Sequence, residues 1–257
     1  MTQLTWSPVQ YATHAAPRLR PALDLLARVD LANAASVVDL GCGTGVVLPA
    51  LRERFPNARL VGVDQSAAML AEAADTDGGA ELVEADAAIW RPDRPVDLIY
   101  SNAVLQWIPG HRQLLPDLFG CCRTLAVQVP NNFASPSQQL VLELAKEPPW
   151  RDRLGDLQLG ENVLAPGDYL SLLQVAGASV DLWETTYYQL MTGADPVLDW
   201  LRGTTLLRVH AALDGAGSEA TEAFERSLAE RLRAAYPTDA AGVTVFPFKR
   251  LFFVATH

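Results

Sequence analysis

Cysteine, net positive charge and long apolar runs are scarce or missing in this 257-residue sequence, and each shortage narrows its function. The three cysteines, Cys42, Cys121 and Cys122, are odd in number and two are adjacent, which suits neither a disulfide framework nor a zinc site. We therefore expect reduced, buried thiols and no bound metal. No apolar stretch approaches membrane-spanning length, and the first residues lack the basic and apolar runs of a signal peptide. These features predict a cytoplasmic protein without a membrane partner.

The charge balance is acidic, because 30 Asp and Glu residues outnumber 20 Lys and Arg residues and give a formal net charge of −10. Such a long-range field repels phosphates, so nucleic acid is not expected as a partner. A small anionic ligand is still compatible with it, since a few arginines in a closed pocket suffice. With 49% hydrophobic and 19% charged residues, the composition is that of a globular protein, which we expect to be a monomer.

The first half of the chain alternates short β-branched runs with segments of helical apolar spacing. The predicted strands are residues 36–40, 59–64, 80–86, 96–102 and 124–130. This alternation is typical of a doubly wound, mostly parallel sheet with helices on both faces. The sequence therefore predicts an α/β fold, with seven strands once the two predicted in the second half are added.

The second half is richer in helical patterns. We predict helices within 137–147 and 166–178, a strand over 179–190 and a last apolar strand over 250–257. A long run of helical pattern precedes that last strand. No linker separates these parts, so we expect a single domain over 1–257 in which 131–165 and 191–247 are insertions on the substrate side. The second insertion would form a helical lid that could cover a site.

A glycine-rich turn follows the first predicted strand. In "VVDLGCGTG", Gly41, Gly43 and Gly45 leave the backbone free to turn tightly and to approach a ligand closely. The spacing does not fit the dinucleotide fingerprint G-x-G-x-x-G in either frame, and the nearby Asp39 would disfavour a pyrophosphate. S-adenosylmethionine has no phosphate and carries a sulfonium and an ammonium group, so it suits this turn. The alternative is that Asp39 merely caps the next helix.

Polar residues also end the next three predicted strands. Asp64, with the neighbouring Gln65, could accept both ribose hydroxyls, as acids do in nicotinamide enzymes, or could cap the following helix. Asp86 could accept from an adenine amino group beside the Ala87 backbone, or be a turn residue without a ligand. Asn102 ends the fourth strand. Together with Asp39, these residues predict one adenosine-type site at the carboxyl edge of the sheet.

These motifs resemble known families. "VVDLGCGTG" with Asp64 and Asp86 resembles class I S-adenosylmethionine-dependent methyltransferases over 36–130, which implies a Rossmann-like fold. Further segments resemble the trans-aconitate 2-methyltransferase family, among them "LAVQVPNNF", "VDLWETTYYQLMTG" and "VFPFKRLFFVA". That resemblance implies methyl transfer to one carboxylate of a tricarboxylic acid, giving a monomethyl ester. One departure is Gln138, where the family's Pro-Ser-His motif has histidine.

The implied chemistry needs positioning rather than a catalytic side chain. A carboxylate is already ionised at neutral pH, so no general base is expected and no catalytic residue is predicted. The enzyme must hold an oxygen in line with the S–CH3 bond, and a dry pocket favours the loss of opposite charges. Cations should therefore hold the carboxylates that do not react, because a clamp on the attacking oxygen would weaken the nucleophile.

Candidate cations are Arg202 and Arg208 in the second insertion, and Lys249 and Arg250 near the last strand. The family resemblance singles out Arg208, in the Gly-Thr motif, and Arg250, in the Phe-Pro-Phe-basic-Arg motif. The alternative for any of these arginines is a surface salt bridge.

Tyr11, Gln106 and Trp107 are possible pocket walls, with ordinary packing as their alternative. Two other functions stay open. One is a methyltransferase acting on another small acid or on carbon, which predicts a more apolar pocket without basic residues. The other is a protein that binds S-adenosylmethionine without turnover. A nicotinamide dehydrogenase is disfavoured by the glycine spacing.

Overall fold

The computed structural model describes residues 15–257 apart from 77 and 216, and the chain divides into two compact units. The described part of the sheet unit comprises residues 15–130, 161–185 and 250–257. The described part of the helical unit comprises residues 131–160 and 186–249. Each unit is described separately below.

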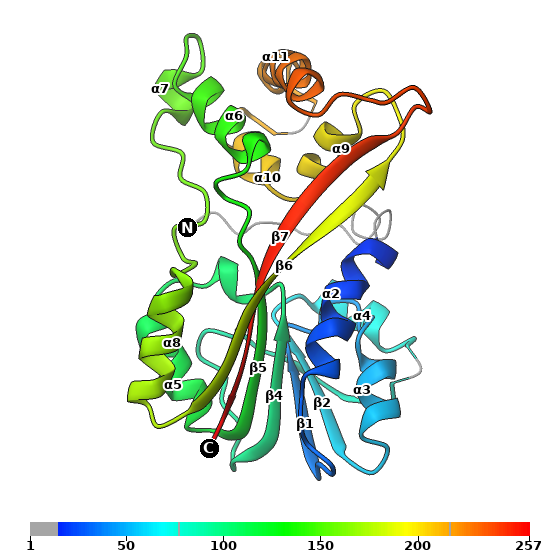
Figure 1. Ribbon diagram of the computed structural model, residues 1–257, viewed down its shortest axis with the longest axis vertical. Coiled ribbons are helices and arrows are strands. Elements are labelled where there is room, and N and C mark those ends of the chain that lie inside the picture. Colours follow the sequence, from blue (N-terminus) through cyan, green and yellow to red (C-terminus); the bar gives the residue numbers. More distant parts are fainter. Residues whose placement is uncertain (1–14, 77, 216) are drawn as a thin grey trace. The chain divides into compact units, whose positions relative to one another are not determined.

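A seven-stranded sheet with the order β3-β2-β1-β4-β5-β7-β6 is the frame of the fold (Figure 1). The strands are β1 Ser36–Leu40, β2 Arg59–Asp64, β3 Glu81–Glu84, β4 Val96–Asn102, β5 Cys122–Pro130, β6 Ser179–Met191 and β7 Thr244–Thr256. The ladders among β1 to β5 are parallel, whereas β7 pairs with β5 in the antiparallel direction. The predicted mostly parallel, seven-stranded fold is confirmed.

Several strand boundaries differ from the prediction, and β5, for example, begins at Cys122, two residues before the predicted start. β3 ends at Glu84, two residues early, because the chain turns at Asp86. β7 begins at Thr244, six residues before the predicted start at Arg250. Burial alternates along its first residues, with Thr244, Phe246 and Phe248 buried, so the period-two pattern continues through the proline that interrupts it in the sequence.

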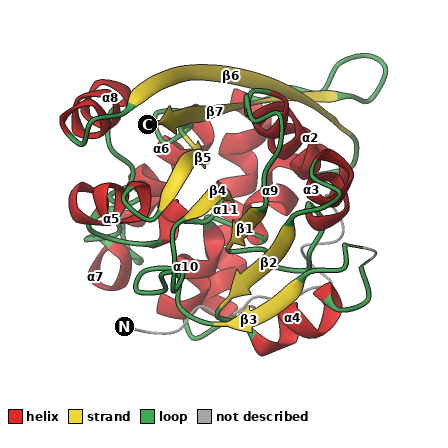
Figure 2. Ribbon diagram, turned by 90° about the horizontal axis from the view of Figure 1, so that it is seen from below, coloured by secondary structure: helices red, strands yellow, loops and turns green. Residues whose placement is uncertain are grey.

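Helices cover both faces of the sheet. On one face lie α2 Ala15–Ala27, α3 Leu48–Arg54 and α4 Ala67–Ala73, and on the other α5 His111–Phe119 and α8 Pro166–Val175 (Figures 1 and 2). Successive residues of β4 show the alternation. The Tyr100 hydroxyl donates to the Ala22 carbonyl of α2 at 2.7 Å, whereas Ile99 belongs to the core beneath α5.

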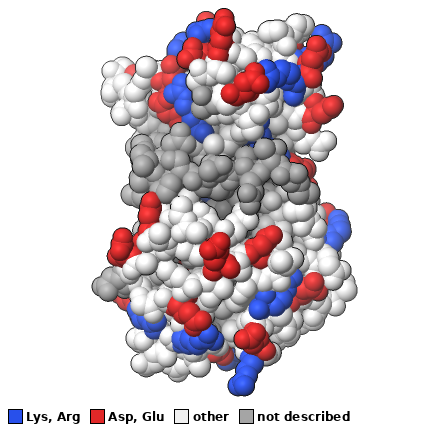
Figure 3. Space-filling model, turned by 180° about the vertical axis from the view of Figure 1, so that it is seen from behind, with Lys and Arg blue, Asp and Glu red and all other residues white. Residues whose placement is uncertain are grey.

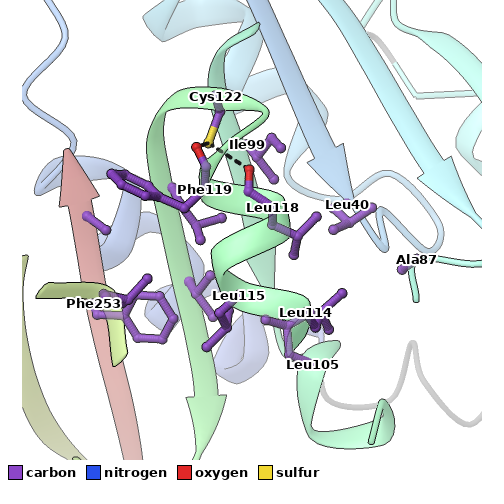
Figure 4. Packing of buried hydrophobic residues seen from close by; sticks show 14 of the residues in the cluster. Leu40, Ala87, Ile99, Leu105, Leu114, Leu115, Leu118, Phe119, Cys122 and Phe253 are labelled. Carbon is purple, nitrogen blue, oxygen red and sulfur yellow. Dashed lines mark hydrogen bonds between the residues drawn. The ribbon is translucent and has the colours of Figure 1, made fainter. Parts of the chain in front are cut away.

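The core beneath α5 is a single cluster of buried, mostly apolar side chains. Figure 4 shows Leu115, Leu118 and Phe119 of α5 gathered with Ile99 and Phe253 of the sheet. The Cys122 thiol donates to the Leu118 carbonyl at 3.4 Å, and burial raises the pKa of this thiol to about 12. All three cysteines are free, as expected, although Cys121 is only half-buried.

The helical unit has its own core. Its helices are α6 Pro136–Ala145, α7 Arg151–Leu154, α9 Pro196–Arg202, α10 Leu206–Ala212 and α11 Glu219–Ala235. Trp150 meets Phe224 edge to face at 5.3 Å, and Trp200 packs against Phe246. Arg231 binds both oxygens of Glu147, at 2.9 and 2.7 Å. The unit contains most of both predicted insertions, and their action as a lid stays a prediction.

Over the described ranges, no helix is long and apolar enough to cross a bilayer. No group of three or more His, Cys, Asp or Glu side chains is placed to hold a metal ion in that same part of the chain.

The α5 core can be tested with Leu118→Ala. Leu118 is fully buried, so the substitution should lower the free energy of unfolding by about 2–5 kcal/mol through lost burial and a cavity. Chemical denaturation measures the change. Val175→Ala is the control, because this α8 side chain is 89% exposed and should change stability by less than about 0.5 kcal/mol. If both variants changed the free energy of unfolding equally, the packing of Leu118 in the α5 core would be contradicted.

Candidate functional site

The candidate site lies in the sheet unit, where several strands end together. Strand register places Asp39 of β1 opposite Gly62 and Tyr100, and Asn102 of β4 opposite Gln128 of β5. Because side chains alternate along a strand, Asp39, Asn102 and Gln128 share the face on which Tyr100 reaches α2. The sheet therefore carries a row of polar side chains on that face.

Asp39 is a buried acid that lacks a complete set of partners. It is 2% exposed, and its Oδ2 accepts no hydrogen bond from any described residue. Burial, and secondly the charge of Asp64, raise the pKa of this carboxyl from 3.8 to about 7. Asp39 is not the cap of the next helix, since Val47 occupies that position without a side-chain bond. A buried acceptor of this kind fits a cationic ligand.

The glycine turn is fixed by left-handed backbone and by tight packing. Gly41, Gly43 and Gly45 have φ values of +81°, +56° and +76°, which disfavour other residues. A Cβ at Gly41 would lie 2.2 Å from the Val104 Cγ2 atom, whereas at Gly43 nothing lies within 4 Å. Only Gly43 has open space on its Cβ side, because a Cβ at Gly41 or Gly45 would meet side chains of the protein itself. Ligand binding by all three glycines stays a prediction.

Asp64 joins the glycine turn to the next helix. Its Oδ2 accepts from the Gly43 amide and its Oδ1 from the Ser66 amide, both at 2.9 Å. Ser66, not Asp64, is the N-cap of α4, because its hydroxyl accepts from Met69. Each Asp64 oxygen has a further lone pair, so the carboxylate is held in place and can still accept a hydroxyl. Gln65, beside it, is exposed.

The turn after β3 presents an acid and an exposed apolar side chain. Asp86 is exposed, and its Oδ1 accepts from the Ala88 amide at 2.8 Å. The Ala87 side chain faces the α5 core (Figure 4), so only its backbone is available to a ligand. Ile89 is 80% exposed, which sequence reasoning missed, because an isoleucine in a turn carries no signal of its own.

The segment after β4 combines unpaired oxygens with strained backbone. The Asn102 Oδ1 and Gln106 Oε1 atoms are buried and find no hydrogen-bond partner within the described ranges. Ala103 between them has φ +58°, which is unusual for a residue with a Cβ. Gln106 donates to the Ala103 carbonyl at 2.7 Å from the short helix η1, Leu105–Trp107. Trp107 is half-buried.

His111 holds this segment and is not a base. Its Nε2 donates to the Leu105 carbonyl at 2.8 Å, and its Nδ1 accepts from the Tyr169 hydroxyl at 2.7 Å, while that hydroxyl accepts from the Leu164 amide. Burial lowers the pKa of His111, which keeps the ring neutral. Both ring nitrogens are therefore occupied in structural hydrogen bonds.

The candidate arginines have different surroundings. Arg250 is 8% exposed and stands opposite Pro130 at the end of β5, where its Nη1 donates to Gln128 Oε1 at 3.4 Å. Arg208, in the helical unit, donates to the Gln158 carbonyl at 3.1 Å. Arg202 binds Glu225 through two nitrogens and also Asp199, as expected of a structural salt bridge.

The structure thus brings Asp39, Asn102 and Arg250 to one face and one edge of the sheet, and Asp39 lies next to the glycine turn. Tyr11 lies outside the described residues. Gln128, which sequence reasoning did not select, lies among these residues. The only sequence feature that could have identified Gln128 is that it is a polar residue within the apolar run of β5.

Comparison with known proteins defines the class first. A protein-family profile described as a methyltransferase domain matches residues 37–124. A solved structure described as a methyltransferase from Bacillus halodurans is similar in fold, with a TM-score of 0.58 at 16% identity, covering 92% of this chain and 98% of that one. Fold and profile together define a Rossmann-like methyltransferase.

Curated relatives identify the family. The chain is 49% identical to a trans-aconitate 2-methyltransferase of Streptomyces coelicolor, over 99% of this chain and 87% of that protein. It is 42% identical to one of an Azoarcus species, over 98% and 99% of the two chains. The chain belongs to the trans-aconitate 2-methyltransferase family, a family of S-adenosylmethionine-dependent enzymes. The predicted family, enzyme class and cofactor are confirmed.

The two roles of the glycines predict different outcomes for two alanine variants. Gly41→Ala should lower the free energy of unfolding by about 2–4 kcal/mol, because the new Cβ would overlap Val104. Gly43→Ala should cost about 1 kcal/mol, yet weaken S-adenosylhomocysteine binding at least about tenfold by filling the open side of the turn. Denaturation measures the loss of stability, and calorimetry measures the loss of affinity. If both variants lost the same stability and the same affinity, the different surroundings of the two glycines would not matter, and the expectation would be contradicted.

Asp39→Asn should stabilise the ligand-free protein at alkaline pH. Between pH 3.8 and about 7 the folded protein holds a proton on Asp39 that the unfolded chain has lost, so stability falls as pH rises through this window. The variant should therefore gain about 1–3 kcal/mol at pH 8 and nothing at pH 4. It should also bind S-adenosylhomocysteine at least about tenfold more weakly.

Denaturation at both pH values and calorimetry check this expectation. Asp93→Asn, at an exposed position, serves as the control that should change neither quantity. If Asp39→Asn lowered the free energy of unfolding at pH 8, the conclusion that burial disfavours the ionised form of Asp39 would be contradicted.

Proposed function

We propose that the protein transfers the methyl group of S-adenosylmethionine to one carboxylate of trans-aconitate and so forms a monomethyl ester. The family relationship supports this reaction, since relatives 40–49% identical carry that name. The observation that carries the proposal is Arg250, a buried guanidinium on the sheet face that also carries Asp39. A buried cation on that face suits an anionic substrate better than an apolar one.

On the cofactor side, each proposed contact uses a feature described above. Bound S-adenosylmethionine supplies a methyl group on a cationic sulfur. The unpaired Asp39 oxygen would hold the positive part of the molecule, and the open backbone at Gly43 would admit it. Asp64, with Gln65, would accept the ribose hydroxyls. Asp86 and the Ala87 backbone would bind the adenine, and Asn102 would complete the site.

On the substrate side, Arg250 would bind a carboxylate that does not react, leaving the attacking oxygen free of a cation. Gln106 and Trp107 would form a wall of the pocket from η1. For Arg208, the same role as that of Arg250 is a proposal that rests on the family motif, and for Tyr11 the role of a pocket wall rests on the sequence. A lid formed by the second insertion would exclude water.

The proposed reaction proceeds without a general base. The attacking carboxylate is ionised at neutral pH, so no proton must be removed from it. His111, whose ring nitrogens both make structural hydrogen bonds, has no proton-transfer role. The chain's residues act by holding the oxygen in line with the methyl group, which removes the entropy of orientation from the barrier.

A related acid is the second candidate substrate. Gln138 stands where the family has histidine, and its amide exchanges hydrogen bonds with the Thr205 hydroxyl at 3.0 and 3.2 Å in the helical unit. This difference favours a variation in the acid rather than in the cofactor. Neither methylation of carbon nor binding without turnover draws support from the buried Arg250.

We further propose a cytoplasmic monomer with neither nucleic acid nor membrane as a partner. In support, Figure 3 shows acidic and basic side chains interspersed on the visible face, without a continuous basic patch among the residues coloured there. The net charge of −10 also disfavours binding to the negatively charged phosphates of nucleic acid.

The test is incubation with labelled S-adenosylmethionine and a panel of di- and tricarboxylates. Trans-aconitate should give a base-labile methyl ester. Arg250→Ala and Arg208→Ala should each raise the KM for the acid at least about tenfold, and should change S-adenosylhomocysteine affinity less than about twofold. Arg112→Ala is the matched control, because this arginine pairs with Asp168 on the surface of α5 and α8. No product with any acid, or equal loss of both ligands, would contradict the proposal.

A further inference from the structure

Gln128 is a polar residue at a position of β5 where packing alone favours an apolar one. Its side chain is fully buried, as are those of Val127 and Val129 on either side. The Nε2 atom of Gln128 finds no hydrogen-bond partner among the described residues. A buried amide donor without an acceptor is destabilising, and a leucine would bury a similar volume without this cost. Stability therefore does not explain the amide, whereas binding of a ligand group that accepts a hydrogen bond does.

The orientation of this amide is set by its oxygen. Gln128 Oε1 accepts from the Nη1 atom of Arg250 at 3.4 Å. A guanidinium has donors and no acceptor, so the amide oxygen, not the NH2 group, faces Arg250. The NH2 group therefore lies on the other side of the amide, and its N–H bonds are left for an acceptor that the described residues do not supply.

The neighbouring strand carries a group of the opposite hydrogen-bonding type. Asn102 of β4 lies opposite Gln128 in the parallel register, so the two side chains share one face of the sheet. Asn102 Oδ1 is buried and finds no donor within the described ranges. Each amide thus keeps one unpaired atom. The Asn102 oxygen suits a donor or a cation, and the Gln128 nitrogen suits an acceptor or an anion.

The sheet order separates Gln128 from the acids of the candidate site. Asp64 belongs to β2 and Asp39 to β1, and β4 lies between them and β5. A carboxylate that approaches this edge is repelled by the acids of β1 and β2 and meets an unpaired donor at β5. The unpaired groups therefore change from acceptors to a donor between β4 and β5, which suits a cation on one side and an anion on the other.

We propose that Gln128 is a substrate-binding residue, whose Nε2 donates to a carboxylate oxygen of the acid. This inference rests on the proposed function. The amide is neutral, so it orients the anion without placing a positive charge on it. S-adenosylmethionine carries a carboxylate as well, which is the other source of the same ligand chemistry. The acid is favoured because β5 lies on the side of β4 away from Asp39 and the glycine turn.

Two variants test this role by steady-state kinetics with trans-aconitate. Gln128→Met keeps the length of the side chain and removes the donor. Gln128→Glu keeps an oxygen for the Arg250 contact and replaces the NH2 group with a second oxygen. Both should raise the KM for the acid at least about tenfold and leave kcat within about threefold, because a hydrogen bond to a charged group is lost. If Gln128 served only as an acceptor for Arg250, Gln128→Glu would keep the wild-type KM.

Thr124→Val is the matched control. Thr124 lies on the same face of β5, is 1% exposed and has a buried hydroxyl that no described residue hydrogen-bonds. The variant therefore removes a comparable polar group outside the site, and its KM should equal that of the wild type. Calorimetry with S-adenosylhomocysteine should give an affinity within about twofold of the wild type for all three variants, which also verifies folding.

Nuclear magnetic resonance provides a readout that does not depend on turnover. The side-chain NH2 signals of Gln128 are assigned by their loss in Gln128→Met. When trans-aconitate is added to protein saturated with S-adenosylhomocysteine, they should move downfield, because the amide then donates to a carboxylate. The NH2 signals of Gln113, which donates to Asp117 on the surface of α5, should stay in place.

The outcomes separate this inference from the proposed function. If the wild type esterifies trans-aconitate but either variant keeps its KM, or the Gln128 signals stay in place, substrate binding by Gln128 is overturned and the reaction stands. A bridging water between Gln128 and Asn102 would give that result. Loss of S-adenosylhomocysteine affinity at an unchanged KM would assign Gln128 to the cofactor's carboxylate and overturn it equally. If the wild type esterifies no acid, the proposed function fails, and the Gln128 signals still decide whether this amide binds a carboxylate.

Discussion

The unpaired carboxylate of Asp39 is the constraint on which the rest of the site depends. It lies inside the sheet where solvent cannot stabilise its charge, and the nearby Asp64 charge opposes ionisation further. Asp64 in turn holds the glycine turn through the Gly43 amide. The strand end therefore carries a buried acid with an unpaired oxygen, which a cation would complement.

Farther along the same face of the sheet lies a buried group of the opposite charge, the guanidinium of Arg250. Arg250 is buried, and its Nη1 donates to the amide oxygen of Gln128. A buried acid at β1 and a buried cation at β7 would suit a reaction in which a positive donor meets a negative acceptor. The neutral ring of His111 adds no charge and serves only to hold η1.

The sequence predicted the parts of this site that follow from local rules. Glycines after a strand, and acids at strand ends, predicted which edge of the sheet carries the polar side chains, because parallel strands bring their carboxyl ends to one edge. Arg250 was selected through a family motif, and its burial was not predicted. The buried position of Gln128 beside Arg250 was not predicted either, because it depends on pairing between strands far apart in sequence. The start of β7 was missed because Pro247 hid an alternating pattern that tertiary packing supports. Which glycine faces open space also depends on packing.

One strand contributes to both hydrophobic cores. Phe246 and Phe248 of β7 belong to the core of the helical unit, and Phe253 belongs to the core of the sheet unit. β7 follows every other described element in chain order. Its residues in both cores are therefore synthesised after all the other strands and helices. During synthesis, both apolar cores therefore stay incomplete until β7 has been made, and hydrophobic surface stays exposed until then.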